Sequence, residues 1–205
     1  MSLFPIFVKL EGRLVVIVGG GAIAEGKISS LLAAGARVRV IAPDVSAGIK
    51  DLVKSEKIEW HAKEFKANDL AEAFLVVAAT SAPGVNEAVF READARGLLC
   101  NAVDDIQHCH FYYGSVVQRG DLQIAISTNG KSPALAQRLR RELENQFGPE
   151  YEQWLEWLGA AREVVRANEG DADSKKAALH QLASQPMFER FLREANRETS
   201  QQGAA

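Results

Sequence analysis

Three small residues, Gly19, Gly21 and Ala24, follow an apolar run and together read G-x-G-x-x-A. In such a turn the first glycine allows the tight bend, the second lets a phosphate approach the backbone, and the alanine lets the helix pack closely on the strand. A helix that begins near Ala22 would also direct free N–H groups and its positive dipole end toward an anion. The spacing predicts a site for the pyrophosphate of a dinucleotide, although glycine turns also serve as plain strand-to-helix connections.

A second group of chemically capable residues is Asn101-Ala102-Val103-Asp104-Asp105, which also follows an apolar run. A carboxylate at the end of a sheet strand could accept a proton while a hydride leaves toward a bound cofactor. Adjacent acids are also common as caps in loops, and composition alone favours that interpretation. The residues therefore leave two roles open for Asp104 and Asp105.

Alternating strands and helices must position both groups. The apolar pattern predicts strands at 14–18, 37–42, 58–60, 74–79 and 98–103, with helices from about 22 to Gly35 and from 85 to Gly97. This alternation predicts an α/β fold with a Rossmann-like, mostly parallel sheet, in which ligands sit beyond the carboxyl ends of the strands. The segments expected to converge there are residues 19–23, Pro43 with Asp44, Thr80 with Ser81, and residues 101–105.

Asp44 lies beyond the second predicted strand, at about the 20-residue offset where a ribose-binding acid is expected. It is a candidate ribose contact and, equally, an ordinary turn aspartate after Pro43. No Arg or Lys follows that strand directly. This favours NAD over NADP, because the additional phosphate of NADP needs a cation nearby.

The pattern changes after residue 110. Two strand-like runs, 111–117 and 122–127, predict a hairpin, and Ser132 followed by Pro133 is a strong helix start. A strand pair with one helix is too small to stand alone, which suggests a dimerisation element; the alternative is that the hairpin extends the same sheet.

The predicted order is therefore a dinucleotide-binding domain at 1–112, a small α+β dimerisation element at 113–148, a C-terminal helical domain at 149–197, and a disordered tail at 198–205.

The composition is that of an ordinary soluble globular protein. The 205 residues are 47% hydrophobic and carry a formal net charge of -3, which gives no indication of nucleic-acid binding. No apolar run approaches the length of a membrane span, and the N-terminus lacks the pattern of a signal peptide, so we expect a cytoplasmic protein. The two cysteines, Cys100 and Cys109, are too few for a disulfide framework and are expected to be reduced.

Several motifs in order carry a resemblance to a known family. They are Gly19-Gly20-Gly21-x-x-Ala24-x-x-Lys27, Asn101-x-Val103-Asp104-Asp105, Gly120-Asp121-Leu122, and the run from Ile126 through Ser132-Pro133 to Ala136. Over about residues 4–147 the chain resembles the siroheme synthase N-terminal family, the precorrin-2 dehydrogenases. The resemblance implies NAD-dependent oxidation of precorrin-2 to sirohydrochlorin, insertion of ferrous iron to give siroheme in some members, and an intertwined homodimer formed through the middle segment.

The resemblance also implies roles for particular residues. Asp104 falls on the essential aspartate of the family, the general base, which also assists the metal step in bifunctional members. Cofactor contacts fall on Ala22 and Ile23 and on Pro43 and Asp44. The family segment Ser-x-x-Gly-x-Ser-Pro lies beside the tetrapyrrole, and its counterparts near the substrate here are Ser127, Thr128, Lys131 and Ser132.

The residues of that segment independently suit an acidic ligand. A helix N-terminus capped by Ser132, with Lys131 beside it and Arg138 further along, would attract the carboxylates of a tetrapyrrole. For Arg140 and Arg141, the solvated face of an amphipathic helix is the favoured interpretation.

His108-Cys109-His110 is a compact set of possible metal ligands. Along an extended chain the two histidines would point to one side and Cys109 to the other, so one ion could not easily take all three. We therefore predict no metal site and expect solvent-exposed loop histidines.

A function from another class is a dinucleotide-sensing regulatory module without catalysis. Such a sensor has no chemical reason to carry Asp104 together with the segment from Ser127 to Ala136, which favours the enzyme.

Overall fold

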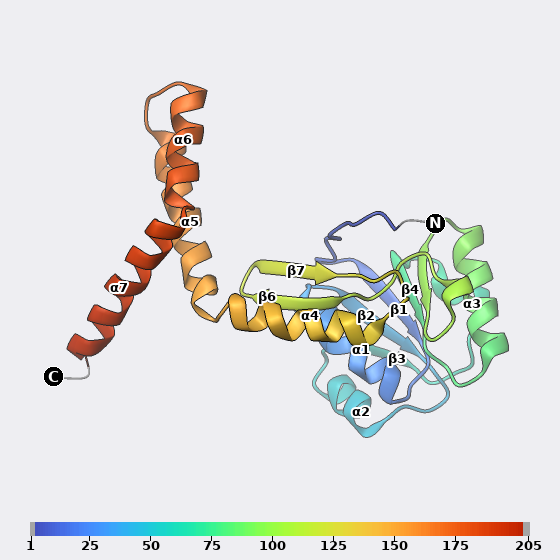
Figure 1. The fold of residues 1–205 in the computed structure, drawn as a ribbon. Coiled ribbons are helices and arrows are strands. Elements are labelled where there is room, and N and C mark those ends of the chain that lie inside the picture. Colours follow the sequence, from blue (N-terminus) through green and yellow to red (C-terminus); the bar gives the residue numbers. More distant parts are fainter. Residues whose placement is uncertain (1–2, 203–205) are drawn as a thin grey trace. The chain divides into compact units, whose positions relative to one another are not determined.

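The computed structural model describes residues 3–202 and divides into two compact units, Met1–Tyr113 and Gly114–Ala205 (Figure 1). The boundary falls one residue after the predicted end of the dinucleotide-binding domain. The second unit contains both the predicted dimerisation element and the predicted helical domain.

The first unit is built on the predicted parallel sheet. Its five strands stand in the order β3-β2-β1-β4-β5, and each neighbouring pair is parallel. The Rossmann-like fold class is thereby confirmed, with strand ends within a residue or two of the prediction. The strands are β1 (Leu14–Val18), β2 (Arg37–Ile41), β3 (Glu59–His61), β4 (Leu75–Ala78) and β5 (Leu99–Ala102).

Helices cover both faces of this sheet, and β1 is buried along its whole length. Val15 and Ile17 lie in one core cluster with residues of α1 (Ala22–Ala33) and α2 (Ala47–Lys54). Val16 and Val18 lie in the other cluster, with residues of α3 (Pro83–Ala95) and the 3-10 turn η1 (Ala67–Leu70). A strand buried on both faces needs the continuous apolar run that the sequence shows, not an alternating pattern.

The helix α2 was not predicted from the sequence. The Ser46 side chain caps it by accepting a hydrogen bond from the Ile49 backbone N–H at 3.3 Å. Ile49 itself is fully buried and fixes the short helix to the core. A cap followed by Ile49, Leu52 and Val53 is the helical signal that the sequence carries here, although Gly48 weakens it.

The second unit begins with the predicted hairpin. The strands β6 (Ser115–Arg119) and β7 (Leu122–Ile126) form an antiparallel sheet of their own, so the alternative that they extend the parallel sheet is wrong. The helix α4 (Pro133–Gln146) begins after Ser132 as predicted. Arg119 ties the hairpin to the end of α4, because its guanidinium donates to the carbonyl oxygens of Phe147 at 2.8 Å and Glu144 at 3.1 Å.

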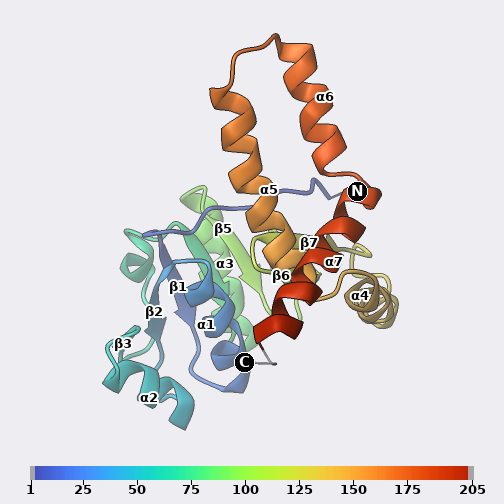
Figure 2. The same ribbon diagram turned by 90° about the vertical axis from the view of Figure 1, so that its left-hand side faces the viewer.

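Three further helices complete this unit, α5 (Glu150–Ala167), α6 (Ala172–Leu182) and α7 (Gln185–Gln202). Figures 1 and 2 show α5 and α6 side by side and antiparallel. Trp154 on α5 is buried against Phe188 and Phe191 of α7, with ring centroids 5.4 and 5.3 Å away.

The disordered tail predicted from residue 198 is helical as far as Gln202, because extending an existing helix costs far less than nucleating one. Residues 203–205 of that predicted tail lie outside the described residues. Within residues 3–202 no helix is both long and apolar enough to cross a membrane.

Candidate functional site

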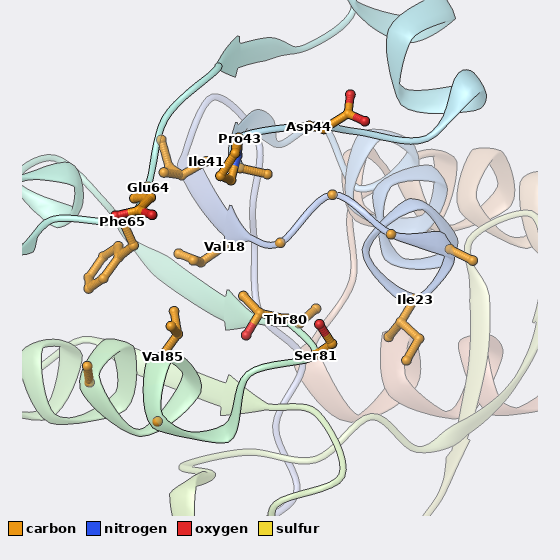
Figure 3. A pocket seen from close by; sticks show the side chains of 18 residues that line it. Val18, Ile23, Ile41, Pro43, Asp44, Glu64, Phe65, Thr80, Ser81 and Val85 are labelled. Carbon is orange, nitrogen blue, oxygen red and sulfur yellow. The ribbon is translucent and has the colours of Figure 1, made fainter.

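A cleft of about 690 Å³ opens at the carboxyl ends of β1, β2 and β4 (Figure 3). Its lining includes all seven residues predicted to bind the cofactor, which are Gly19, Gly21, Ala22, Ile23, Pro43, Asp44 and Thr80. Most of the remaining lining is apolar, and the charged residues in it are Asp44 and Glu64. An apolar cleft with a few polar groups is typical of a small-molecule site.

Three consecutive glycines line this cleft, and the structure explains the presence of glycine differently at each position. Gly19 has a φ of 120°, and a Cβ there would overlap the Ala79 carbonyl oxygen and lie 2.6 Å from the Ala79 carbonyl carbon. A Cβ on Gly20 would overlap the Asp44 carbonyl oxygen. Gly21 has an ordinary φ of -83°, and a Cβ there would meet nothing within 4 Å. The protein therefore needs glycine at 19 and 20 for its own packing, whereas at Gly21 the missing side chain leaves open space at the cleft.

The start of α1 faces this open space. Gly21 is its N-cap residue and provides no side-chain hydrogen bond, in contrast to Ser46 on α2 and Ser132 on α4. The first N–H groups of a helix lack partners within the helix, so those at Ala22 and Ile23 are available to an anion. The Ile23 side chain is 51% exposed beside them.

Asp44 lies at the rim of the cleft, where Figure 3 shows its carboxylate pointing away from Thr80 and Val85. The Lys50 ammonium lies 2.9 Å from the Asp44 Oδ1 atom. The hydrogen bond from Lys50, with a backbone hydrogen bond from Val45, lowers the pKa of Asp44 below its usual value. A carboxylate held ionised at this place can accept hydrogen bonds from ribose hydroxyls.

Thr80 reaches the cleft from the end of β4, but its polar groups are held by Asn86. The Thr80 hydroxyl and backbone N–H both donate to the Asn86 Oδ1 atom, at 2.8 and 3.1 Å, and the Asn86 amide donates back to the Thr80 carbonyl at 3.1 Å. Asn86 is 7% exposed. Thr80 therefore shapes the loop between β4 and α3, and Asn86, which supports this loop, was not predicted from the sequence.

Other lining residues were also missed from the sequence. Glu64 and Phe65 follow β3, and Val85 and Ala88 come from α3. Nothing in the local sequence marks these four residues, because their position depends on which strands are neighbours.

Asp104 follows β5 but does not line the cleft. The expectation that residues 101–105 converge with the other three segments is therefore not met within this cleft. Asp104 is exposed and has a φ of 62°, a left-handed conformation that few residues other than glycine adopt. The turn is closed behind it by a hydrogen bond from the Asp105 N–H to the Ala102 carbonyl at 3.2 Å.

His108, Cys109 and His110 all make hydrogen bonds near this turn. The expectation of solvent-exposed loop histidines holds for His110, which is exposed, and not for His108, which is half-buried. His108 ends the 3-10 turn η2 (Ile106–His108), and its Nδ1 atom lies 2.6 Å from the Asp105 carboxylate. This hydrogen bond lowers the pKa of Asp105. The His110 Nε2 atom lies 3.1 Å from Asp94. Among the described residues, no group of three or more His, Cys, Asp or Glu side chains could hold a metal ion.

Both cysteines are free thiols, as the sequence predicts. Burial raises the pKa of Cys100 to about 12 and also raises the pKa of Cys109. The Cys109 thiol donates to the carbonyls of Ala102 and Asp105 at 3.1 and 3.2 Å.

The four residues predicted to bind substrate lie in the loop between β7 and α4 of the second unit. Ser132 caps α4 through the Leu135 N–H at 3.2 Å, and the Thr128 hydroxyl accepts from the Ser132 N–H at 3.2 Å. Ser127 accepts from the Asn129 N–H at 3.2 Å, and Lys131 is exposed. These hydroxyls therefore order the loop, and their contact with a substrate stays a prediction.

Two independent observations indicate that the cleft suits a dinucleotide. The open space at Gly21 and the uncapped start of α1 suit the pyrophosphate, and the Asp44 carboxylate at the rim suits a ribose. Comparison with known proteins agrees, since residues 6–115 match the profile of a family described as "Putative NAD(P)-binding". The chain belongs to this NAD(P)-binding family. A second profile, described as "Sirohaem biosynthesis protein central", matches residues 119–146.

Curated relatives of this NAD(P)-binding chain include two siroheme synthases. That of Neisseria meningitidis serogroup C is 43% identical over 166 residues, covering 81% of this chain and 34% of the relative. That of Actinobacillus pleuropneumoniae serotype 3 is 36% identical over 191 residues, covering 93% of this chain and 39% of the relative. The chain thus spans a little over a third of the length of these relatives.

A solved structure titled "SirC, precorrin-2 dehydrogenase" resembles the chain with a TM-score of 0.78 and 28% identity, covering 95% of this chain and all of that one. The resemblance to the siroheme synthase N-terminal family is thereby confirmed.

Proposed function

We propose that this chain oxidises precorrin-2 to sirohydrochlorin with NAD as the hydride acceptor. The observation that carries the proposal is the cleft itself, with its open phosphate position at Gly21, in a chain that matches the SirC precorrin-2 dehydrogenase along almost its whole length. The match to siroheme synthases supports the same pathway.

The chemistry divides between the cofactor and Asp104. Bound NAD supplies the acceptor for a hydride that leaves a carbon of the tetrapyrrole. Asp104 accepts the proton that leaves the neighbouring atom, so that two electrons and two hydrogens are removed and a new double bond forms. Asp104 follows β5, which neighbours β4 at the same carboxyl edge of the sheet as the cleft. Its exposed carboxylate is open to a substrate.

The acidic substrate needs a basic and hydrogen-bonding surface, and we assign this role to the loop of Ser127, Thr128, Lys131 and Ser132. The exposed Lys131 supplies a positive charge, and the start of α4 supplies the positive end of a helix dipole.

An anaerobic absorbance time course with precorrin-2 tests this proposal. Conversion to sirohydrochlorin that needs both NAD and the protein is the expected result. The variant Asp104→Asn keeps the shape of the side chain and should bind NAD but form no product. If NAD binds and the tetrapyrrole spectrum does not change beyond the protein-free control, the enzyme proposal fails in favour of a dinucleotide-sensing module.

We also propose that the same site inserts ferrous iron, with the Asp104 carboxylate accepting one of the two pyrrole N–H protons that the iron displaces and water accepting the other. Ferrous iron is a substrate in this step. Adding it anaerobically to the completed first reaction should give the siroheme spectrum faster with the protein than without it.

We also propose a cytoplasmic homodimer assembled through the hairpin of β6 and β7. A two-stranded sheet is marginal in water, and Val116 on β6 is 43% exposed. Free thiols at Cys100 and Cys109 suit a reducing compartment. Light scattering during gel filtration should give the mass of a dimer.

A further inference from the structure

Asp44, which lines the cleft, forms an ion pair with Lys50, which does not line it. From the sequence, no cation follows β2 directly, and this favoured NAD over NADP. In the fold, α2 returns Lys50 to within 2.9 Å of the Asp44 carboxylate. The absence of a cation in the adjoining sequence therefore does not mean that a cation is absent from the site.

The backbone holds both partners in fixed places beside the glycine turn. The Asp44 backbone lies directly against Gly20, and the Ser46 N–H donates to the Gly20 carbonyl at 2.8 Å. Lys50 lies one helical turn further, where its N–H donates to the Ser46 carbonyl at 3.1 Å. The neighbouring Ile49 is fully buried, so the helix α2 that carries Lys50 is anchored to the core.

Charge decides what this rim can accept. The charged residues in the described lining, Asp44 and Glu64, are both acids and would repel an additional phosphate on the ribose. Lys50 supplies an opposing charge and three donors on a flexible stem. Its side chain is 45% exposed and that of Asp44 is 81% exposed, so their ion pair is weak and can exchange partners at small cost.

We propose that Lys50 enables the ribose end of the cleft to accept a 2′-phosphate, so that the chain binds NADP as well as NAD. With NAD, Asp44 accepts hydrogen bonds from the ribose hydroxyls while Lys50 stays on Asp44. With NADP, the Lys50 ammonium moves to the phosphate. The proposal rests on the dinucleotide site of the proposed function and not on the oxidation of a tetrapyrrole.

Calorimetric titration of the full chain with NAD and with NADP tests it directly. Wild type should bind both, with dissociation constants within about tenfold of each other. Lys50→Gln should weaken NADP about five- to tenfold, the effect of losing one exposed charged contact, and NAD by less than about twofold. The matched control is Lys54→Gln, which removes the same charge from the same helix, where Lys54 pairs with Asp51 at 3.1 Å. It should change neither constant by more than about twofold.

A second variant acts in the opposite direction. Asp44→Asn should weaken NAD and shift the preference toward NADP, because it removes a negative charge and frees Lys50. The fragments 2′,5′-ADP and 5′-AMP should show the same dependence on Lys50 as the two dinucleotides, which would place the effect on the ribose.

Three results would overturn the proposal. They are a wild type that binds NAD but not NADP, a Lys50→Gln variant that weakens both dinucleotides equally, and a Lys54→Gln variant with the same effect as Lys50→Gln. A wild type that binds neither dinucleotide would instead refute the proposed function, and this proposal with it.

Discussion

Alanine substitutions at Gly19 and at Gly21 should have different effects, the first on the stability of the fold and the second on the binding of the cofactor. At Gly19 the new methyl group meets the Ala79 backbone, and the φ of 120° is strained for any L-residue. The conformational strain costs about 1–2 kcal/mol and the overlap about 1–3 kcal/mol more. Gly19→Ala should therefore lower the free energy of unfolding of the first unit by about 2–5 kcal/mol.

Gly21→Ala should behave differently, since its φ of -83° suits alanine and its Cβ would enter open space. Alanine restricts the unfolded chain, which stabilises by about 0.4–1 kcal/mol, but it is a poorer N-cap than glycine by a similar amount. The net change in stability should be within about 0.5 kcal/mol of zero. The methyl group would occupy the place of a phosphate, and losing one charged hydrogen bond should weaken NAD by about tenfold or more.

Two measurements report these effects separately. Hydrogen exchange of the buried β1 amides gives the opening free energy of the first unit, and calorimetry gives the dissociation constant for NAD. The control is Gly26→Ala on α1, where a Cβ also meets nothing within 4 Å. It should stabilise the helix by about 0.5–1 kcal/mol and leave NAD binding unchanged. A Gly21→Ala variant that binds NAD like wild type would refute the assignment of this open space to the cofactor.

Three further predictions concern other residues. Asp104→Gly should be more stable to heat than Asp104→Ala by about 1 kcal/mol, because glycine tolerates the φ of 62°, and both should lack dehydrogenase activity. Ser132→Ala should destabilise α4 by about 1 kcal/mol in hydrogen exchange, whereas Ser132→Asp keeps the cap but should bind the polycarboxylate product sirohydrochlorin more weakly in an absorbance titration. Burial raises the pKa of Cys100 from an unfolded value of 9.0 to about 12. The contribution of this thiol to stability is therefore complete below pH 9 and is lost as the pH rises toward 12. The free energy of unfolding in urea should fall less steeply at alkaline pH for Cys100→Ala than for wild type, and parallel curves would contradict this.

The local signals in the sequence were sufficient for most elements of the fold. The glycine turn, the buried β1 and the start of α4 at Ser132 depend on neighbouring residues alone, and each lies where predicted. The helix α2 was missed because it has only eight residues, contains Gly48 and buries mainly Ile49. Missing α2 also meant missing that Lys50 lies 2.9 Å from the Asp44 carboxylate, a contact that depends on this helix.

The site could be predicted only in part, because its composition depends on strand order. The order β3-β2-β1-β4-β5 places Phe65 and Glu64, which follow the edge strand β3, on the cleft. The same order places Asp104 after β5, the opposite edge strand, and outside the lining. Sequence spacing identifies the segments at the carboxyl edge, but it does not state which of them are neighbours.

The side chains of His108-Cys109-His110 are of the types that bind metal ions, but in this structure they form hydrogen bonds around the turn at Asp104. The Cys109 thiol donates to carbonyls on both sides of Asp104, His108 holds the Asp105 carboxylate, and the His110 ring accepts the Cys100 N–H at 3.1 Å. A left-handed residue such as Asp104 persists only when its surroundings constrain it, and these contacts provide the constraint. A metal ion bound by the Cys109 thiolate would replace the two hydrogen bonds that the thiol donates to this turn. The three residues of this motif therefore argue for a fixed backbone at Asp104, which gives a candidate general base a defined place after β5.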